Sequence, residues 1–80
     1  MPRLTLEPFN DGVFRVLDGQ GQQLGNLKLI GGQWKFKAVG FDAQGALVPG
    51  GGPLTDRHNE IFATPDEAAV NDRLNAPPQR

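Results

Sequence analysis

Residues 24–41 have the sequence LGNLKLIGGQWKFKAVGF and contain the longest strand candidate of this 80-residue chain. The segments Leu24 to Ile30 and Gln33 to Phe41 largely alternate apolar and polar side chains, which is typical of strands with one buried face. Only Gly31 and Gly32 separate them, and two glycines at this spacing suit a primed hairpin turn. We therefore expect an antiparallel hairpin here.

The segments that precede and follow this hairpin also predict strands. Arg3 to Glu7 alternates until Pro8, and Gly12 to Leu17 is rich in β-branched and aromatic residues. The turn signals are Asp18-Gly19-Gln20-Gly21 and Asp42-Ala43-Gln44-Gly45, and the second predicts a type I turn closed by a left-handed glycine before Ala46-Leu47-Val48. Residues 3–48 should form an antiparallel meander of four to five strands.

The sequence after residue 48 predicts helix. A Gly/Pro loop, 49–53, precedes Leu54, His58, Ile61 and Phe62, whose spacing favours a helix of one or two turns capped by Thr55. Thr64 and Glu67 then form a capping box with Pro65 at the first helical position, predicting a helix through Leu74. The C-terminal half is thus expected to be helical over 55–75.

Together these segments predict a single α+β domain over residues 1–76, with sheet at 3–48 and a frayed tail at 77–80. It is a small two-layer domain, an antiparallel meander packed against a C-terminal helix. We expect the helix residues Val70 and Leu74, with Ile61 and Phe62, to cover one face of the sheet. Alternation assigns to that core face Leu4, Leu6, Phe14, Val16, Leu27, Leu29, Trp34, Phe36 and Ala38.

The second sheet face mixes basic with apolar side chains. Its apolar members by alternation are Val13, Leu17, Ile30, Val39 and Phe41, and its only acid is Glu7. Residues 1–41 carry five basic and three acidic side chains, whereas 42–80 carry three basic and six acidic ones. The candidate binding residues are the five cations of this face: Arg3, Arg15, Lys28, Lys35 and Lys37.

Three interpretations of this face stay open. Lysine stems can cover a solvated face and protect edge strands. A mixed apolar and basic face can also contact a protein partner or a second copy of the chain. Nucleic acid is a further possibility, though not the favoured one, because the net charge is −1 and the face lacks aromatic stacking platforms.

Composition excludes several kinds of chemistry. The chain has no Cys, Ser or Tyr, so a serine or cysteine triad and a thiolate metal site are impossible. With one histidine, His58, we expect no metal and no cofactor, and we expect the protein not to be an enzyme. Apolar runs are too short to span a membrane, and the absence of a signal segment favours the cytoplasm.

An alternative site for an anion lies in the Gly-rich loop and the polar cluster that follows it. Glycine amides before a helix can bind phosphate, but Pro53-Leu54-Thr55 replaces the ending that a Walker loop needs. The candidate residues are Gly50, Gly51, Gly52, Arg57 and His58. They would serve an anion-binding protein or a small hydrolase, whereas the position of His58 on the apolar stripe predicts packing at the core edge.

The run Phe62-Ala63-Thr64-Pro65-Asp66-Glu67-Ala68-Ala69 resembles the step from sheet to packing helix in AP2-type DNA-binding domains. Those domains read the major groove with a three-stranded sheet bearing Arg and Trp. This chain departs from them in its acidic balance, the inserted stretch 42–61 and its few strand arginines. We interpret the resemblance as a shared way of joining a sheet to a helix. The expected function is that of a small non-enzymatic binding or protein-interaction module that acts through its open sheet face or edge. Self-association through that face or edge is an open alternative.

Overall fold

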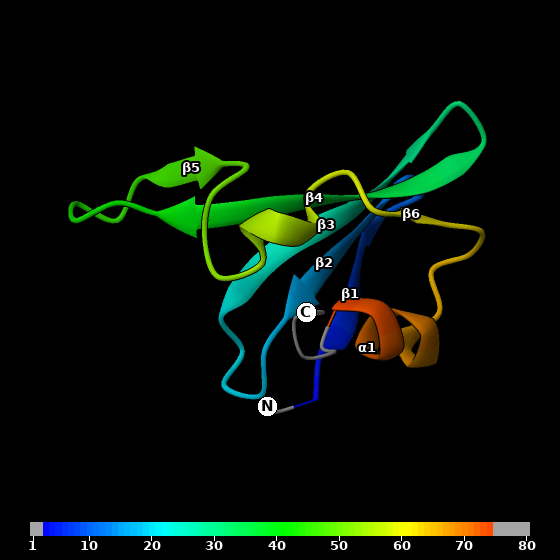
Figure 1. Ribbon diagram of the computed structural model, residues 1–80, viewed down its shortest axis with the longest axis horizontal. Helices are drawn as coiled ribbons and strands as arrows, with labels where there is room; N and C mark the ends of the chain where they lie inside the picture. The colour runs from blue at the N-terminus through cyan, green and yellow to red at the C-terminus, as the bar shows by residue number, and fades with distance from the viewer. Residues whose placement is uncertain (1–2, 75–80) are drawn as a thin grey trace.

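A computed structural model of the chain describes residues 3–74, and it confirms the small α+β domain. Five antiparallel strands form a meander in the order β1-β2-β3-β4-β5, and a sixth strand pairs with β4 (Figure 1). The only helices among these residues are a 3-10 turn, η1, and a C-terminal α1. The bounds are β1 Thr5–Asn10, β2 Val13–Leu17, β3 Gln23–Ile30, β4 Gln33–Phe41, β5 Leu47–Pro49, η1 Thr55–Arg57, β6 Ile61–Phe62 and α1 Glu67–Leu74.

The predicted hairpin is the central pair of the sheet. Ile30 lies opposite Gln33, so the loop between β3 and β4 has two residues. Gly31 and Gly32 have φ angles of 58° and 81°, the left-handed values that a type I′ turn requires at both positions. The turn therefore fixes the register of the sheet, because a slip by one residue would exchange its two faces.

Residues 54–62 do not form the predicted helix beyond a single 3-10 turn. Ile61 and Phe62 are instead strand β6, and they pair with Lys35 and Trp34 of β4. Alternation in a strand places Phe62 in the core, 2% exposed, and Ile61 on the opposite face, 41% exposed. Thr55 caps no helix, because its hydroxyl donates to the Gly50 carbonyl oxygen at 2.7 Å.

Two glycines are required by close packing against β4. A Cβ on Gly25 would lie 2.5 Å from the Phe36 ring, so the phenyl group packs over bare backbone. A Cβ on Gly40 would lie 2.6 Å from the Gly52 nitrogen, and Gly52 itself has φ of 87°. The Gly/Pro loop is thus folded tightly against the end of β4.

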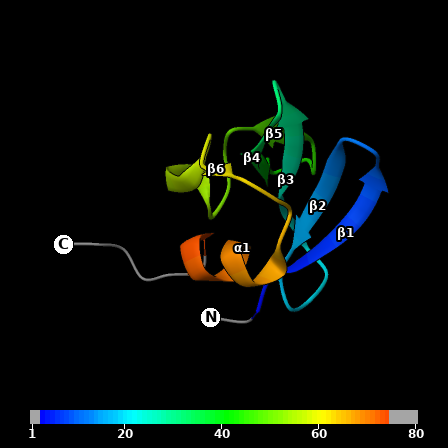
Figure 2. The same ribbon diagram turned by 90° about the vertical axis from the view of Figure 1, so that its right-hand side faces the viewer.

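Helix α1 lies on one side of the sheet (Figure 2), and the core combines buried strand residues with Val70 and Leu74 of α1. Leu29 was predicted to belong to it but is 46% exposed, because the end of the β3–β4 hairpin extends past the helix. Val39 lies on the second face by alternation yet is only 5% exposed, and it lines hollows bordered by β5 and by the Gly/Pro loop. The buried residues are Leu4, Val16, Leu24, Leu27, Phe36, Ala38, Val39, Leu54, Phe62, Val70 and Leu74.

Helix α1 begins later than the capping box predicts. Asp66, not Thr64, is the capping side chain, since its Oδ1 accepts from the Ala68 amide at 3.3 Å. The Glu67 carboxylate, expected to cap the helix, instead accepts from the Leu6 amide at 3.0 Å. An unpaired amide on edge strand β1 competes for this carboxylate, and satisfying it fixes the helix to the sheet.

Side chains of α1 bond to the backbone at two edges of the sheet, beside β1 and on β6. Asn71 accepts from the Leu4 amide at 2.7 Å and donates to the Leu4 carbonyl oxygen at 2.9 Å. At the other edge, Arg73 donates to the Ile61 carbonyl oxygen at 2.6 Å, forms an ion pair with Glu60 and lies 4.6 Å from the centre of the Phe62 ring. An eight-residue helix thereby holds β1 and β6 together. The sequence beyond residue 74, including the predicted tail, lies outside the described residues.

Candidate binding site on the open sheet face

Three predicted cations come together on the face of the sheet opposite α1, here called the open face. Lys28 of β3 lies directly opposite Lys35 of β4, and Lys37 follows two residues along β4, opposite Asn26. None of these lysines has an acidic side chain within 4.0 Å among residues 3–74. Like charges directly opposite each other in a sheet are destabilising, so this arrangement costs folding free energy.

Edge protection does not account for the lysine cluster Lys28, Lys35 and Lys37. Both of its strands are interior: β3 lies between β2 and β4, and β4 lies between β3 and the two short strands β5 and β6. Lysine on an edge prevents intermolecular strand pairing, but an interior strand has no free edge to protect. Edge protection therefore does not explain these residues, whereas lysine stems that cover a solvated face stay an open interpretation.

Arg15 belongs to the open face but has partners within the protein. Its guanidinium donates to the Glu7 carboxylate at 3.3 Å, directly across from it on β1. The same group lies 4.5 Å from the centre of the Phe9 ring, which is 59% exposed. Arg15 is thus less available to an external anion than the lysines, while Phe9 is an exposed aromatic ring that the sequence did not assign to this face.

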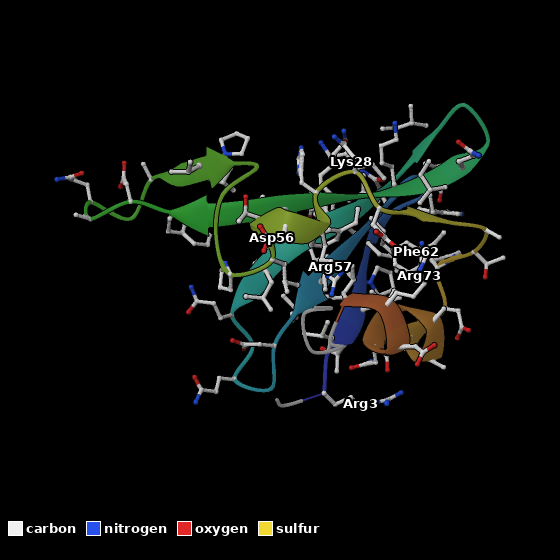
Figure 3. All side chains as sticks on the ribbon, viewed as in Figure 1. Arg3, Lys28, Asp56, Arg57, Phe62 and Arg73 are labelled. Carbon is white, nitrogen blue, oxygen red and sulfur yellow. The ribbon has the colours of Figure 1, made fainter. Side chains whose placement is uncertain are left out.

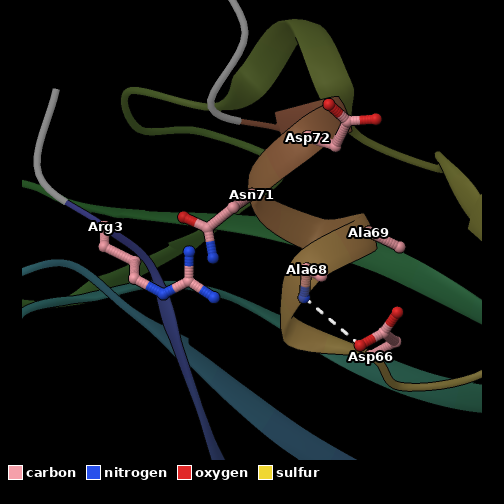
Figure 4. A pocket seen from close by; sticks show the side chains of 6 residues that line it. All are labelled: Arg3, Asp66, Ala68, Ala69, Asn71 and Asp72. Atoms are coloured by element: carbon pink, nitrogen blue, oxygen red, sulfur yellow. Dashed lines mark hydrogen bonds between the residues drawn. The ribbon is translucent and has the colours of Figure 1, made fainter.

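Arg3 does not lie on the open face, contrary to its predicted position. It precedes β1 and lies beside α1, 4.0 Å from the Glu67 carboxylate and at the rim of a shallow groove that also includes Asn71 (Figure 4). Lys28 and Arg3 point to opposite sides of the molecule (Figure 3). Arg3 lies outside strand β1, so strand alternation does not fix the side of the sheet on which it lies.

A hollow of about 470 Å³ adjoins the lysine cluster and joins parts of both predicted sites. Lys28 and Lys37 come from the basic face, and Gly50 and His58 come from the alternative anion site. Its other lining residues are Asn26, Ala38, Val39, Leu47 and Pro49. Lys35, Gly51, Gly52 and Arg57 are not among the lining residues, so the structure unites only part of each predicted set.

The Gly-rich loop is not an array of free amides. The Gly50 amide donates to the Ala38 carbonyl oxygen at 2.7 Å, and the Gly51 amide donates to that of Val48 at 3.2 Å. A loop that binds phosphate through its backbone needs such donors to point at the ligand. Here two of the three glycine amides are already bonded within the protein. The Gly50 amide attaches the loop to β4, and the Gly51 amide closes the turn of the loop.

His58 completes the outer edge of β4, where the strand changes partner from β6 to β5. The Ala38 amide donates to His58 Nδ1 at 3.0 Å, so the imidazole replaces a strand carbonyl. On one side, Phe36 exchanges backbone hydrogen bonds of 2.7 Å with residues 59 and 60, and on the other, Ala38 accepts from Gly50. Because Nδ1 accepts this bond, neutral His58 carries its hydrogen on Nε2. The half-buried ring bonds to the buried Ala38, but the helical stripe on which the predicted packing at the core edge rested does not form.

Hydrogen bonds also orient the polar side chains around the hollow. Gln23 Nε2 donates to Asn26 Oδ1 at 2.8 Å, and Lys37 Nζ donates to Asn59 Oδ1 at 2.5 Å. Asn59 has a left-handed φ of 76°, at the turn that brings His58 to β4. The sequence pattern did not mark Asn26, Leu47 and Pro49 as parts of a site, although alternation placed Asn26 on the correct face.

No protein family model matches this chain, and the searches of curated proteins and of solved structures found no significant match. No helix within residues 3–74 is long and apolar enough to cross a membrane. The same residues contain no cluster of three or more His, Asp or Glu side chains that could hold a metal ion.

Proposed function

We propose that this chain is a non-enzymatic binding module whose open face receives a negatively charged protein partner. The observation that carries the proposal is the lysine cluster: Lys28 directly faces Lys35 on interior strands, Lys37 lies alongside, and no described acid pairs with them. An acidic partner would relieve this repulsion, and it would gain affinity from positive charges that the sheet already places side by side.

The apolar side chains of the open face support a protein as the partner. Ile61 lies opposite Lys35 and is 41% exposed, and Leu47 is 48% exposed beside the hollow. Exposed apolar groups among cations match an acidic segment that also carries apolar residues. Cytoplasmic location and the absence of enzymatic activity stay predictions.

The β1 and β6 edges of the sheet are poorer contact surfaces than the open face. On β1, the outward amides of Leu4 and Leu6 are bonded to α1 side chains, and Pro8, next in the same alternation, has no amide hydrogen. At β6, Arg73 occupies the Ile61 carbonyl oxygen. Edge pairing needs a row of free donors and acceptors, and these positions offer few.

The homodimer stays a prediction, but the lysine cluster disfavours a symmetric dimer through the open face. A two-fold interface centred on the lysine cluster would bring the lysines of both copies together. A partner with acidic side chains avoids this repulsion.

Nucleic acid is a second candidate because the open face has exposed aromatic rings. Phe9 lies against Arg15 with 59% of its surface exposed, and Phe41 is 43% exposed. Aromatic rings beside cations are the elements with which proteins stack and hold single strands.

An affinity comparison tests the proposal. The probe is a fluorescent peptide of alternating Glu and Val, and its competitor is an oligothymidine of equal length. Lys35→Gln should weaken peptide binding about fivefold to tenfold at low salt, because it removes one cation of the contact. Arg3→Gln, an equal charge change on the helix side, should leave the affinity within about twofold. Equal losses for both variants, or no peptide binding, would refute the proposal. Tighter binding of oligothymidine that also depends on Lys35 would replace the first candidate with the second.

A further inference from the structure

The polar side chains that line the hollow beside the lysine cluster have more free hydrogen-bond donors than free acceptors. Four polar side chains line it: Asn26, Lys28, Lys37 and His58. Each side-chain acceptor among them is already engaged. Asn26 Oδ1 accepts from Gln23, and His58 Nδ1 accepts from the Ala38 amide.

Apart from the second lone pair of Asn26 Oδ1, the hydrogen-bonding groups that remain on these four side chains are donors. Asn26 retains its Nδ2 hydrogens, and neutral His58 retains the hydrogen on Nε2. Lys28 and Lys37 carry three ammonium hydrogens each, of which Lys37 uses one on Asn59. A ligand rich in acceptors and bearing negative charge matches a lining of this kind, whereas a neutral or cationic ligand does not.

The opposite part of the lining is apolar. Val39 is 5% exposed, and Leu47 and Pro49 come from β5, which pairs with the end of β4. The hollow of about 470 Å³ is of the size that accepts small organic molecules. It also combines apolar walls with a few convergent polar groups, as such sites commonly do.

We propose that this hollow binds a small organic oxyanion, a phosphate or a carboxylate carried on a short apolar or aromatic group. The oxygens contact Lys28, Lys37, Asn26 and His58, and the apolar group lies against Leu47 and Pro49. This site goes beyond the proposed function: it shares Lys28 and Lys37 with the open face but does not depend on a macromolecular partner.

Titration of the folded protein with phenyl phosphate, followed by backbone amide shifts, tests the site. The expected result is saturable shifts at Ala38, Val39, Leu47 and Gly50. Inorganic phosphate should bind at least about threefold more weakly, because it lacks the group that contacts the apolar wall. Benzoate separates the two oxyanions: the tighter of phenyl phosphate and benzoate identifies the favoured one. Benzyl alcohol, the neutral control, should produce no saturable shift.

Matched variants separate the hollow from the rest of the open face. Lys28→Gln combined with Lys37→Gln should weaken phenyl phosphate binding at least about tenfold, because two charge-assisted contacts are lost. Lys35→Gln, on the same face but outside the hollow, should change it less than about threefold. Leu47→Glu, at an exposed position that tolerates substitution, should abolish binding by placing a carboxylate beside the oxyanion.

The proposal is overturned if Lys35→Gln weakens binding as much as the double substitution, if Leu47→Glu leaves it unchanged, or if no amide of the hollow shifts. Failure here is distinguishable from failure of the proposed function. That function is measured with the acidic peptide, and its affinity depends on Lys35.

Discussion

The role of His58 as a strand acceptor makes a quantitative prediction for its replacement. In His58→Ala, the Ala38 amide loses the Nδ1 that accepts from it at 3.0 Å. Ala38 is only 1% exposed, so water does not readily replace the lost acceptor. A buried donor left without a partner costs about 1–3 kcal/mol of unfolding free energy. For a domain of this size each kcal/mol lowers Tm by about 4–8 °C, so we expect a loss on the order of 10 °C.

Two further substitutions separate hydrogen bonding from packing. His58→Asn places an amide oxygen near the position of Nδ1. The decrease in Tm should therefore be less than half of that caused by His58→Ala. His58→Phe keeps a ring of similar shape without an acceptor and should remain as destabilised as the alanine variant. Thermal unfolding followed by circular dichroism, with urea unfolding followed by Trp34 fluorescence, measures all three. A phenylalanine variant as stable as the parent chain would refute the acceptor role.

Further predictions concern packing, the helix contacts and the oligomeric state. Gly25→Ala should cost about 1–3 kcal/mol in urea unfolding because its Cβ would meet the Phe36 ring at 2.5 Å. Gly12→Ala, whose Cβ has no neighbour nearer than 3.9 Å, should stay within about 0.5 kcal/mol; equal losses would contradict the packing argument. Asn71→Ala should cost about 1–3 kcal/mol and speed hydrogen exchange of the Leu4 amide, whereas Asp72→Ala, one residue along, should not speed it. Light scattering at low salt should find a monomer. A dimer that dissociates on Lys35→Glu would instead support a symmetric interface through the open face.

The hairpin and the meander were predictable because their signals are local. Two glycines at Gly31 and Gly32 require one turn type, and the alternation around them fixes which side chains face the core. The repeated Asp turns are equally local, since Oδ1 of Asp18 and of Asp42 each accept two amides of their own turn. Such patterns need no knowledge of distant contacts.

The errors arose where a distant strand competed for a local group. Glu67 fits a capping box, but the unpaired Leu6 amide binds its carboxylate instead. Ile61 and Phe62 have helical spacing with Leu54, but the free edge of β4 pairs with them as a strand. Both outcomes depend on contacts between residues far apart in sequence, which a local pattern does not contain.

The candidate site was predictable in part for the same reason. Alternation placed Lys28, Lys35 and Lys37 on one face, and the register then made Lys28 and Lys35 direct neighbours. The hollow also needs β5 and His58 to meet the end of β4, and this meeting follows from tertiary packing. His58, one of the residues of the predicted alternative anion site, accepts a strand hydrogen bond and lines the hollow.

The measurement that most directly tests the open face as the binding surface is amide-shift mapping with the acidic Glu-Val peptide at low salt. The expected shifts are confined to β2, β3, β4 and β6 around the lysine cluster, and they disappear when Lys28, Lys35 and Lys37 are all replaced by Gln. Shifts centred on α1 and Arg3, or a map unchanged by the triple substitution, would contradict it.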